Sequence, residues 1–229
     1  MTARVAVVTF PGSNDDRDAL QALALLGAEP VPVWHEEERL PDVGAVVLPG
    51  GFSYGDYLRC GAIARFSPAM RAVSEFAAAR RPVLGICNGF QVLCEAGLLP
   101  GVLRRNASLE FACADVDVRV EQADTPFTES CAPGDVLTIP IKHGEGAWFA
   151  DGELLDTVER GGQVVLRYAA GNPNGSVNDV AAVVNERRNV MGLMPHPEHA
   201  VDPLLGPTGG LPILESLIAA AGARTPVLA

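Results

Sequence analysis

The chain has 229 residues, 48% of them hydrophobic, and a formal net charge of −11, so we expect one domain over residues 1–229 with a single large core. The acidic balance and the lack of any basic run argue against nucleic acid as a partner, because phosphate backbones are bound through lysine and arginine. No apolar run reaches the length of a bilayer, and the five cysteines form no C-x-x-C pair, so we predict a cytoplasmic protein with no membrane contact, disulfide or metal site.

The first half of the chain alternates apolar strands with helical segments. Residues 4–10, 31–34 and 43–48 have the composition of buried parallel strands. A helical pattern covers residues 16–26, and a second helix is predicted over residues 67–79. This alternation predicts an α/β fold with a flavodoxin-like, doubly wound, mostly parallel sheet and helices on both faces. Ligands of such sheets bind beyond the carboxyl ends of the strands.

Cys87 lies where the next apolar strand, residues 82–86, meets another helix. The sequence GICNG places Gly85 and Gly89 around it, which is the spacing of a nucleophile elbow with sulfur in place of oxygen. Glycines are needed there because a Cβ would clash with the neighbouring strand or the helix start. The helix N-terminus favours a thiolate, and the N–H of Asn88 points to where an oxyanion would form. The elbow therefore predicts acyl transfer through a thioester.

The second half of the chain has a different pattern. Half-exposed strands are predicted over residues 114–120, 136–141, 164–169, 181–184 and 190–194, the last two joined as a hairpin. We expect them to extend the sheet in antiparallel fashion and to make this half mostly β. A final helix is predicted over residues 212–221, with a frayed tail from residue 223.

His196 and Glu198 follow the last of these strands in the sequence PHPE. The prolines around His196 hold the segment extended, so positions two apart face the same way. A carboxylate placed in this manner orients the imidazole while the other ring nitrogen takes the thiol proton. A lone cysteine is more often a small buried apolar residue. Together with this segment, however, Cys87 is predicted to form a triad in the chain order Cys, His, Glu.

Several motifs together resemble a known family. They are FPGSN (residues 10–14), PGGFSYGDYLRCGAIAR (49–65), GICNGFQ (85–91), PIKHGEG (140–146), GNPNGS (171–176) and PHPE (195–198). The chain resembles the class I, or triad, glutamine amidotransferases, and more closely the glutaminase subunits of bacterial phosphoribosylformylglycinamidine synthases. The motifs occur in family order over nearly the whole chain, so the resemblance is specific.

The resemblance implies a role for each matching residue. Cys87 attacks the side-chain amide of glutamine, His196 takes the thiol proton and gives one to departing ammonia, and Glu198 holds His196. The oxyanion is held by backbone N–H groups of three residues, which are Gly51, Phe52 and Asn88. Substrate contacts are implied for Gln91 and Gly51; the other interpretation of Gln91 is a residue on the helix surface.

The resemblance also implies partners. Ammonia passes to a synthetase subunit, which uses ATP to convert formylglycinamide ribonucleotide to the amidine in purine biosynthesis. Whether a small bridging subunit is a further partner stays open. No cofactor is expected on this chain, because it has no Walker-type phosphate loop. ATP and magnesium are therefore expected on the synthetase. Two alternatives stay open, the glutaminase of another amidotransferase and a non-catalytic thiol or regulatory module on the same fold.

Two positions depart from the family pattern. An arginine often follows PHPE and a cysteine often follows FPGSN, whereas this chain has His199 and Asp15. We expect neither to touch the triad, although His199 is a second imidazole that could be mistaken for the base. His143 and Glu145 could form a second acid–base pair, but the glycines around them favour a shaped loop near the glutamine pocket.

Overall fold

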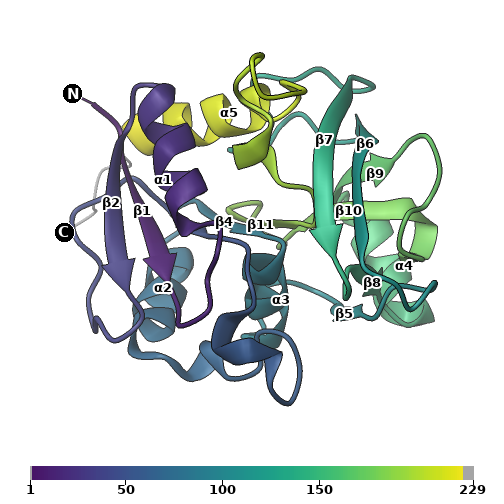
Figure 1. Ribbon diagram of the computed structural model, residues 1–229, viewed down its shortest axis with the longest axis horizontal. Helices are drawn as coiled ribbons and strands as arrows, with labels where there is room; N and C mark the ends of the chain where they lie inside the picture. The colour runs from purple at the N-terminus through teal and green to yellow at the C-terminus, as the bar shows by residue number, and fades with distance from the viewer. Residues whose placement is uncertain (1, 224–229) are drawn as a thin grey trace.

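The computed structural model describes residues 2–223, whose centre is a mixed nine-stranded sheet. Its strands are β1 (Arg4–Thr9), β2 (Glu29–Trp34), β3 (Ala45–Leu48), β4 (Val83–Ile86), β6 (Ala112–Val120), β7 (Val136–His143), β9 (Val164–Tyr168), β10 (Val180–Val184) and β11 (Val190–Leu193). They are arranged in the order β2-β1-β3-β4-β11-β10-β9-β6-β7 (Figure 1). The predicted tail lies outside the described residues from residue 224 onward.

The first five strands in this order are parallel to one another. Strands β3, β4 and β11 are buried along their whole length, because helices cover both faces of this half. In Figure 1, α1 (Asp16–Leu25) and α5 (Leu211–Gly222) lie on one side of these strands, and α2 (Pro68–Ala78) and α3 (Asn88–Glu95) lie on the other. The predicted doubly wound sheet is confirmed.

The remaining four strands pair antiparallel, beginning with the β10–β11 hairpin. Burial alternates along β7, as expected for a strand with one face on the core and one toward solvent. The antiparallel extension of the C-terminal half is therefore also confirmed. A small second sheet, formed by β5 (Val102–Arg104) and β8 (Ala147–Phe149), was not expected from the sequence.

The second half is mostly β, as expected, but it contains one helix that was not predicted. Helix α4 spans Gly152–Arg160, and the carboxylate of Asp151 accepts a hydrogen bond from the N–H of Leu154 at its start. An N-cap aspartate followed by apolar residues at helical spacing, Leu154, Leu155 and Val158, is a signal that could have predicted this helix.

The register of the parallel strands brings distant segments to one edge of the sheet. Ile86 of β4 lies opposite Leu193 of β11, and Gly85 of β4 lies opposite Leu48 of β3. The residues that follow these three strands therefore emerge together, as the carboxyl ends of parallel strands do. They include Cys87, the PHPE segment and Gly51.

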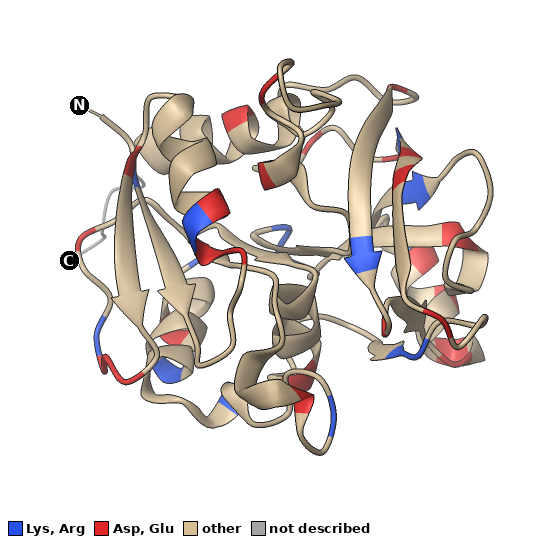
Figure 2. Cartoon of the chain, viewed as in Figure 1, with Lys and Arg blue, Asp and Glu red and all other residues tan. Residues whose placement is uncertain are grey.

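The charged residues form no broad basic face over the part of the chain that is coloured in Figure 2. Lysine and arginine are dispersed among acidic residues on loops, helices and strand ends. Within residues 2–223, no helix combines the length and apolar character needed to cross a bilayer.

Candidate active site

Cys87 occupies the tight turn between β4 and α3. Its backbone has a φ of 50° and a ψ of −103°, a conformation that residues other than glycine rarely adopt. A Cβ on Gly89 would collide with the carbonyl oxygen of Leu48 in β3, and a Cβ on Gly85 would lie 2.7 Å from the carbonyl carbon of Gly89. Both glycines are therefore required by the close approach that the elbow sequence predicted.

Cys87 lines a cavity of about 350 Å³, although only 5% of the residue is exposed. Its Sγ lies 3.8 Å from the carbonyl oxygen of Lys142. This volume is at the small end of the range for ligand sites and suits a molecule the size of an amino acid. The other lining residues are Asn14, Asp15, Gly51, Phe52, Asp56, Cys60, Gln91, Phe111, Lys142, His143, Gly144 and Glu145.

His196 and Glu198 meet beside this cavity, where η4 (Pro197–His199) follows β11. His196 is fully buried, and its Nδ1–H donates to Glu198 Oε1 at 2.7 Å. The N–H of His196 also donates to the carbonyl oxygen of Pro140 at 2.8 Å, which anchors the backbone. Because Glu198 accepts from Nδ1, Nε2 is the free nitrogen, and it has no hydrogen-bond partner within residues 2–223.

The charge on the His196 ring depends on its surroundings. Burial disfavours the charged ring, but the negative charges of Glu198 and Cys87 outweigh burial and raise the pKa of His196 to about 10. The ring is therefore positively charged at neutral pH, and a positively charged imidazole beside a sulfur atom is the arrangement that activates cysteine nucleophiles.

Two backbone N–H groups remain available as oxyanion donors. Those of Gly51 and Asn88 have no hydrogen-bond partner in the described part of the chain. Phe52 was the third predicted donor. This prediction is corrected, because the N–H of Phe52 donates to the carbonyl oxygen of Gly12 at 2.9 Å. This bond belongs to the bridge that pairs Gly51 with Ser13, in which the Gly51 N–H takes no partner from the described residues.

Gln91 lies one helical turn after Cys87 and is only 5% exposed, so its interpretation as a helix-surface residue is wrong. Its Oε1 accepts a hydrogen bond from Asn88 Nδ2 at 2.8 Å, and its Nε2 donates to the carbonyl oxygen of Glu145 at 2.6 Å. The side chain forms part of the cavity wall and retains one N–H for a ligand.

His143 and Glu145 also line the cavity but do not pair with each other in residues 2–223. The Nδ1–H of His143 donates to Asn106 Oδ1 at 3.0 Å, and the N–H of Gly146 donates to the same oxygen at 3.1 Å. The carboxylate of Glu145 accepts from the Cys60 thiol at 3.3 Å. The contacts therefore favour a shaped loop over a second acid–base pair, and Asn106, which the sequence did not single out, holds it.

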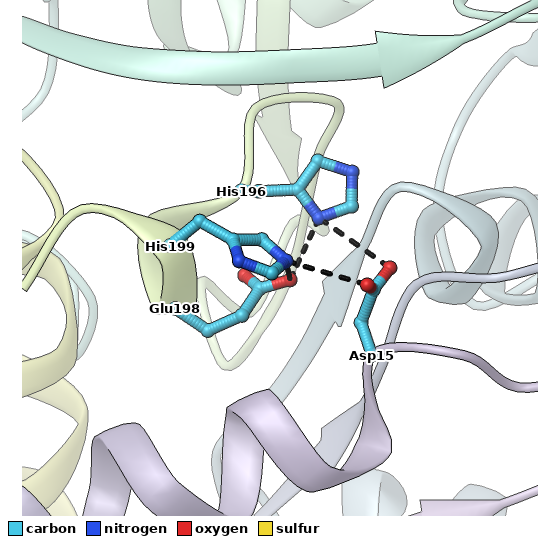
Figure 3. Close-up of side chains that lie close together, drawn as sticks. All are labelled: Asp15, His196, Glu198 and His199. Atoms are coloured by element: carbon cyan, nitrogen blue, oxygen red, sulfur yellow. Dashed lines mark hydrogen bonds and ion pairs between the residues drawn. The ribbon is translucent and has the colours of Figure 1, made fainter. Parts of the chain in front are cut away.

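The expectation that neither Asp15 nor His199 touches the predicted triad is wrong. Figure 3 shows both beside His196 and Glu198. Asp15 Oδ2 lies 3.7 Å from His196 Nδ1, and His199 Nε2 lies 3.7 Å from Glu198 Oε1. Asp15 and His199 also lie 3.3 Å from each other, and Lys142 Nζ contacts both. The two departures from the family pattern are thus neighbours in space.

These side chains include types that bind metals. The donor atoms of Asp15, His196, Glu198 and His199 all lie within 4.8 Å of one another. The ammonium of Lys142, however, lies at hydrogen-bond distance from both Asp15 and His199. The cluster therefore carries its own cation, and we assign no metal to it.

Comparison with known proteins gives a consistent family. Residues 2–208 match the model of the CobB/CobQ-like glutamine amidotransferase domain. The phosphoribosylformylglycinamidine synthase subunit PurQ of Rubrobacter xylanophilus is 61% identical over 95% of this chain and 99% of that protein, and the PurQ subunit of Frankia casuarinae is 55% identical over 94% and 93%. A chain in a structure of PurLQS from Thermotoga maritima is 44% identical, with a TM-score of 0.88 over 96% of this chain and 99% of that chain.

The chain belongs to the PurQ family. It is therefore a glutamine amidotransferase, the glutaminase subunit of a phosphoribosylformylglycinamidine synthase in purine biosynthesis, as the motifs predicted. The two alternatives, another amidotransferase and a non-catalytic module, are set aside because PurQ relatives match this chain over nearly their full length.

Proposed function

We propose that Cys87 and His196 hydrolyse the side-chain amide of glutamine through a thioester. The Cys87 thiolate attacks the amide carbon, and the C–N bond breaks as His196 gives its Nε2 proton to departing ammonia. Neutral His196 then takes a proton from water, whose oxygen attacks the thioester carbon and breaks the C–S bond. Glutamate leaves, and the thiolate and imidazolium are restored. Glu198 accepts the Nδ1–H throughout and holds Nε2 toward the sulfur.

The backbone N–H groups of Gly51 and Asn88 stabilise the tetrahedral oxyanion in this proposal. Gly51 has a φ of 136°, so a side chain there would be strained, and a Cβ would lie 2.5 Å from the backbone nitrogen of Asn14. Losing one oxyanion donor costs about a hundredfold to a thousandfold in rate. Gln91 contributes to glutamine binding through its remaining N–H.

The observation that carries this proposal is the charge pairing at the sheet edge. A strained cysteine lines an amino-acid-sized cavity beside a buried histidine whose Nδ1–H is held by Glu198. This combination provides a nucleophile, a proton carrier and an orienting group.

The test is covalent trapping with a chloroketone analogue of glutamine followed by intact-mass measurement. One adduct is expected in the wild-type chain and none in Cys87→Ala. Cys60→Ala is the matched control, because Cys60 lines the same cavity but stays a thiol. Burial and the charges of Asp56 and Glu145 raise its pKa far above the usual value. An adduct that survives Cys87→Ala would refute the assignment.

The base is tested by substituting the two neighbouring imidazoles separately. His196→Ala should abolish thioester formation, whereas His199→Ala should retain it. Within residues 2–223, Nε2 of His196 has no hydrogen-bond partner and the ring interacts with Cys87, while Nε2 of His199 contacts Lys142 and Asp15. The opposite pattern would make His199 the base.

We also propose a partner that receives the ammonia. Ammonia released into water at neutral pH is protonated and is no nucleophile, so the reaction requires an enclosed path to a synthetase. The similar Thermotoga maritima chain comes from a structure of PurLQS. By analogy, we propose that this chain binds a synthetase subunit and a small bridging subunit in the cytoplasm. It needs no cofactor of its own, and ATP and magnesium bind the synthetase.

Exposed apolar side chains support a docking face beside the cavity. The segment after β3 exposes Tyr57 by 75%, Leu58 by 92% and Phe66 by 74%. Large apolar groups exposed together mark surfaces that bind proteins. Leu58→Glu should abolish co-purification with the synthetase, whereas Leu25→Glu, on the exposed side of α1, should not. Retained binding in Leu58→Glu would move the interface elsewhere.

A further inference from the structure

Asp15 precedes α1 at a position where aspartate ordinarily caps a helix. Its side chain accepts no hydrogen bond from the first turn of α1. The carboxylate turns instead toward β7 and η4, and only 3% of the residue is exposed. Because a local stabilising bond is forgone, the tertiary contacts of Asp15 determine where its carboxylate points.

These contacts lead to the catalytic histidine. Asp15 Oδ1 accepts a hydrogen bond from Lys142 Nζ and lies 3.3 Å from His199 Nε2, while Oδ2 lies 3.7 Å from His196 Nδ1 (Figure 3). Gly50 leaves the space that this arrangement needs, because a Cβ there would lie 2.7 Å from His196 Cε1 and would also collide with Asp15 Oδ2. Lys142 and His199 thus hold one carboxylate oxygen, and the other faces the His196 ring.

We propose that Asp15 is a second carboxylate partner of His196, a positioning residue that supports the imidazolium together with Glu198 and is held in place by Lys142 and His199. This inference rests on the proposed function, in which His196 carries the proton between Cys87 and ammonia. It adds a group that the triad does not include.

The surrounding charges determine whether Asp15 raises or lowers the pKa of His196. The titratable and charged groups around His196 are Asp15, Cys87, Lys142, His143, Glu198 and His199. Burial acts to raise the pKa of Asp15, but hydrogen bonds from His199 and Lys142 and the charges of His196 and Lys142 hold it well below its usual range. Asp15 is therefore ionised at neutral pH. Its negative charge favours a charged His196 ring, and the positive charge of Lys142 opposes it.

Asp15 and Lys142 carry opposite charges, so removing each one should have a different effect on the pKa of His196. General structural damage would not produce this difference. The full-length chain with 13C-labelled histidine is titrated by NMR, and the His196 signal is assigned by its loss in His196→Asn. Asp15→Asn should lower the His196 midpoint by about one pH unit or more, because the carboxylate is an opposite charge within 4 to 6 Å. Lys142→Met should leave the midpoint unchanged or raise it.

Two further variants serve as controls. Asp18→Asn removes the same charge from the first turn of α1 without touching the cluster, so the midpoint should not move. Asp15→Ser also removes the charge and should lower the midpoint as Asp15→Asn does. The alkaline limb of kcat/KM for glutamine should move with the NMR midpoint in each variant.

The outcomes separate this inference from the proposed function. An unchanged midpoint in both Asp15→Asn and Asp15→Ser would overturn the role of Asp15, while loss of trapping in Cys87→Ala would still support the thioester. A midpoint that falls equally in Asp15→Asn and Lys142→Met would indicate general disruption and would also overturn it. If Cys87→Ala keeps glutaminase activity, the mechanism fails, whatever the Asp15 variants show.

Discussion

Replacing Glu198 by glutamine removes one charge from the triad and changes its shape little. Glu198 Oε1 accepts from His196 Nδ1 at 2.7 Å, and both side chains are 1% exposed. An amide oxygen can still accept this hydrogen bond, so the ring stays oriented. The negative charge is lost, however, and that charge is the main one opposing the effect of burial on His196.

The size of the effect expected in Glu198→Gln follows from the pKa of His196. The raised value of about 10 means that the imidazolium persists until the pH rises through 10. Without Glu198, burial pulls the pKa back toward or below the ordinary value of about 6.5. Removing one opposite charge at hydrogen-bond distance typically lowers such a pKa by about 1 to 3 units, so the thiolate–imidazolium pair should become roughly 10- to 1000-fold less populated in Glu198→Gln.

The assay is the rate of Cys87 alkylation by iodoacetamide between pH 6 and 10, read by intact mass with Cys87→Ala as the blank. The wild-type rate should be nearly constant over the upper part of this range. In Glu198→Gln it should be low at neutral pH and rise with pH like that of an ordinary thiol. Glu145→Gln, a change in the cavity wall away from His196, should keep the wild-type profile. An unchanged profile in Glu198→Gln would refute the charge argument.

Three other outcomes are expected. Gln91→Ala should raise KM for glutamine more than it lowers kcat in initial-rate assays, since the Gln91 side chain forms part of the cavity wall and has one N–H left for the substrate. Gly89→Ala should destabilise the fold by about 1 to 3 kcal/mol in thermal melts, because its Cβ would strike the Leu48 carbonyl, whereas Gly152→Ala meets nothing and should not. Burial, and next the charge of His196, lower the pKa of His143 to about 4, so the folded chain binds fewer protons than the unfolded chain between about pH 6.5 and 4. Stability should fall as the pH drops through this window, and urea unfolding of His143→Gln should show a shallower fall.

The sequence alone predicts the parts of the site that depend on local backbone geometry. Gly85 and Gly89 around Cys87 predict a pinched turn because glycine is the residue that such close approach requires. The prolines around His196 likewise predict an extended segment after an apolar strand. Helix α4 could have been predicted from its Asp151 cap, but the alternating strand patterns on both sides of it are the stronger signal in this part of the sequence.

Contacts between residues far apart in the sequence depend on the tertiary structure. Asp15 is 127 residues from Lys142 and 184 residues from His199, and no periodicity within either segment indicates that they meet. They come together because β1, β3, β4 and β11 end at one edge and β7 packs against η4 beside it. The same packing pairs the Phe52 N–H with Gly12 and, among residues 2–223, leaves the N–H of Gly51 without a partner. The sequence by itself thus determined the family and predicted the nucleophile and its partner histidine, because short motifs encode them. Which charges surround that histidine depends on strand order and register, which are properties of the assembled sheet.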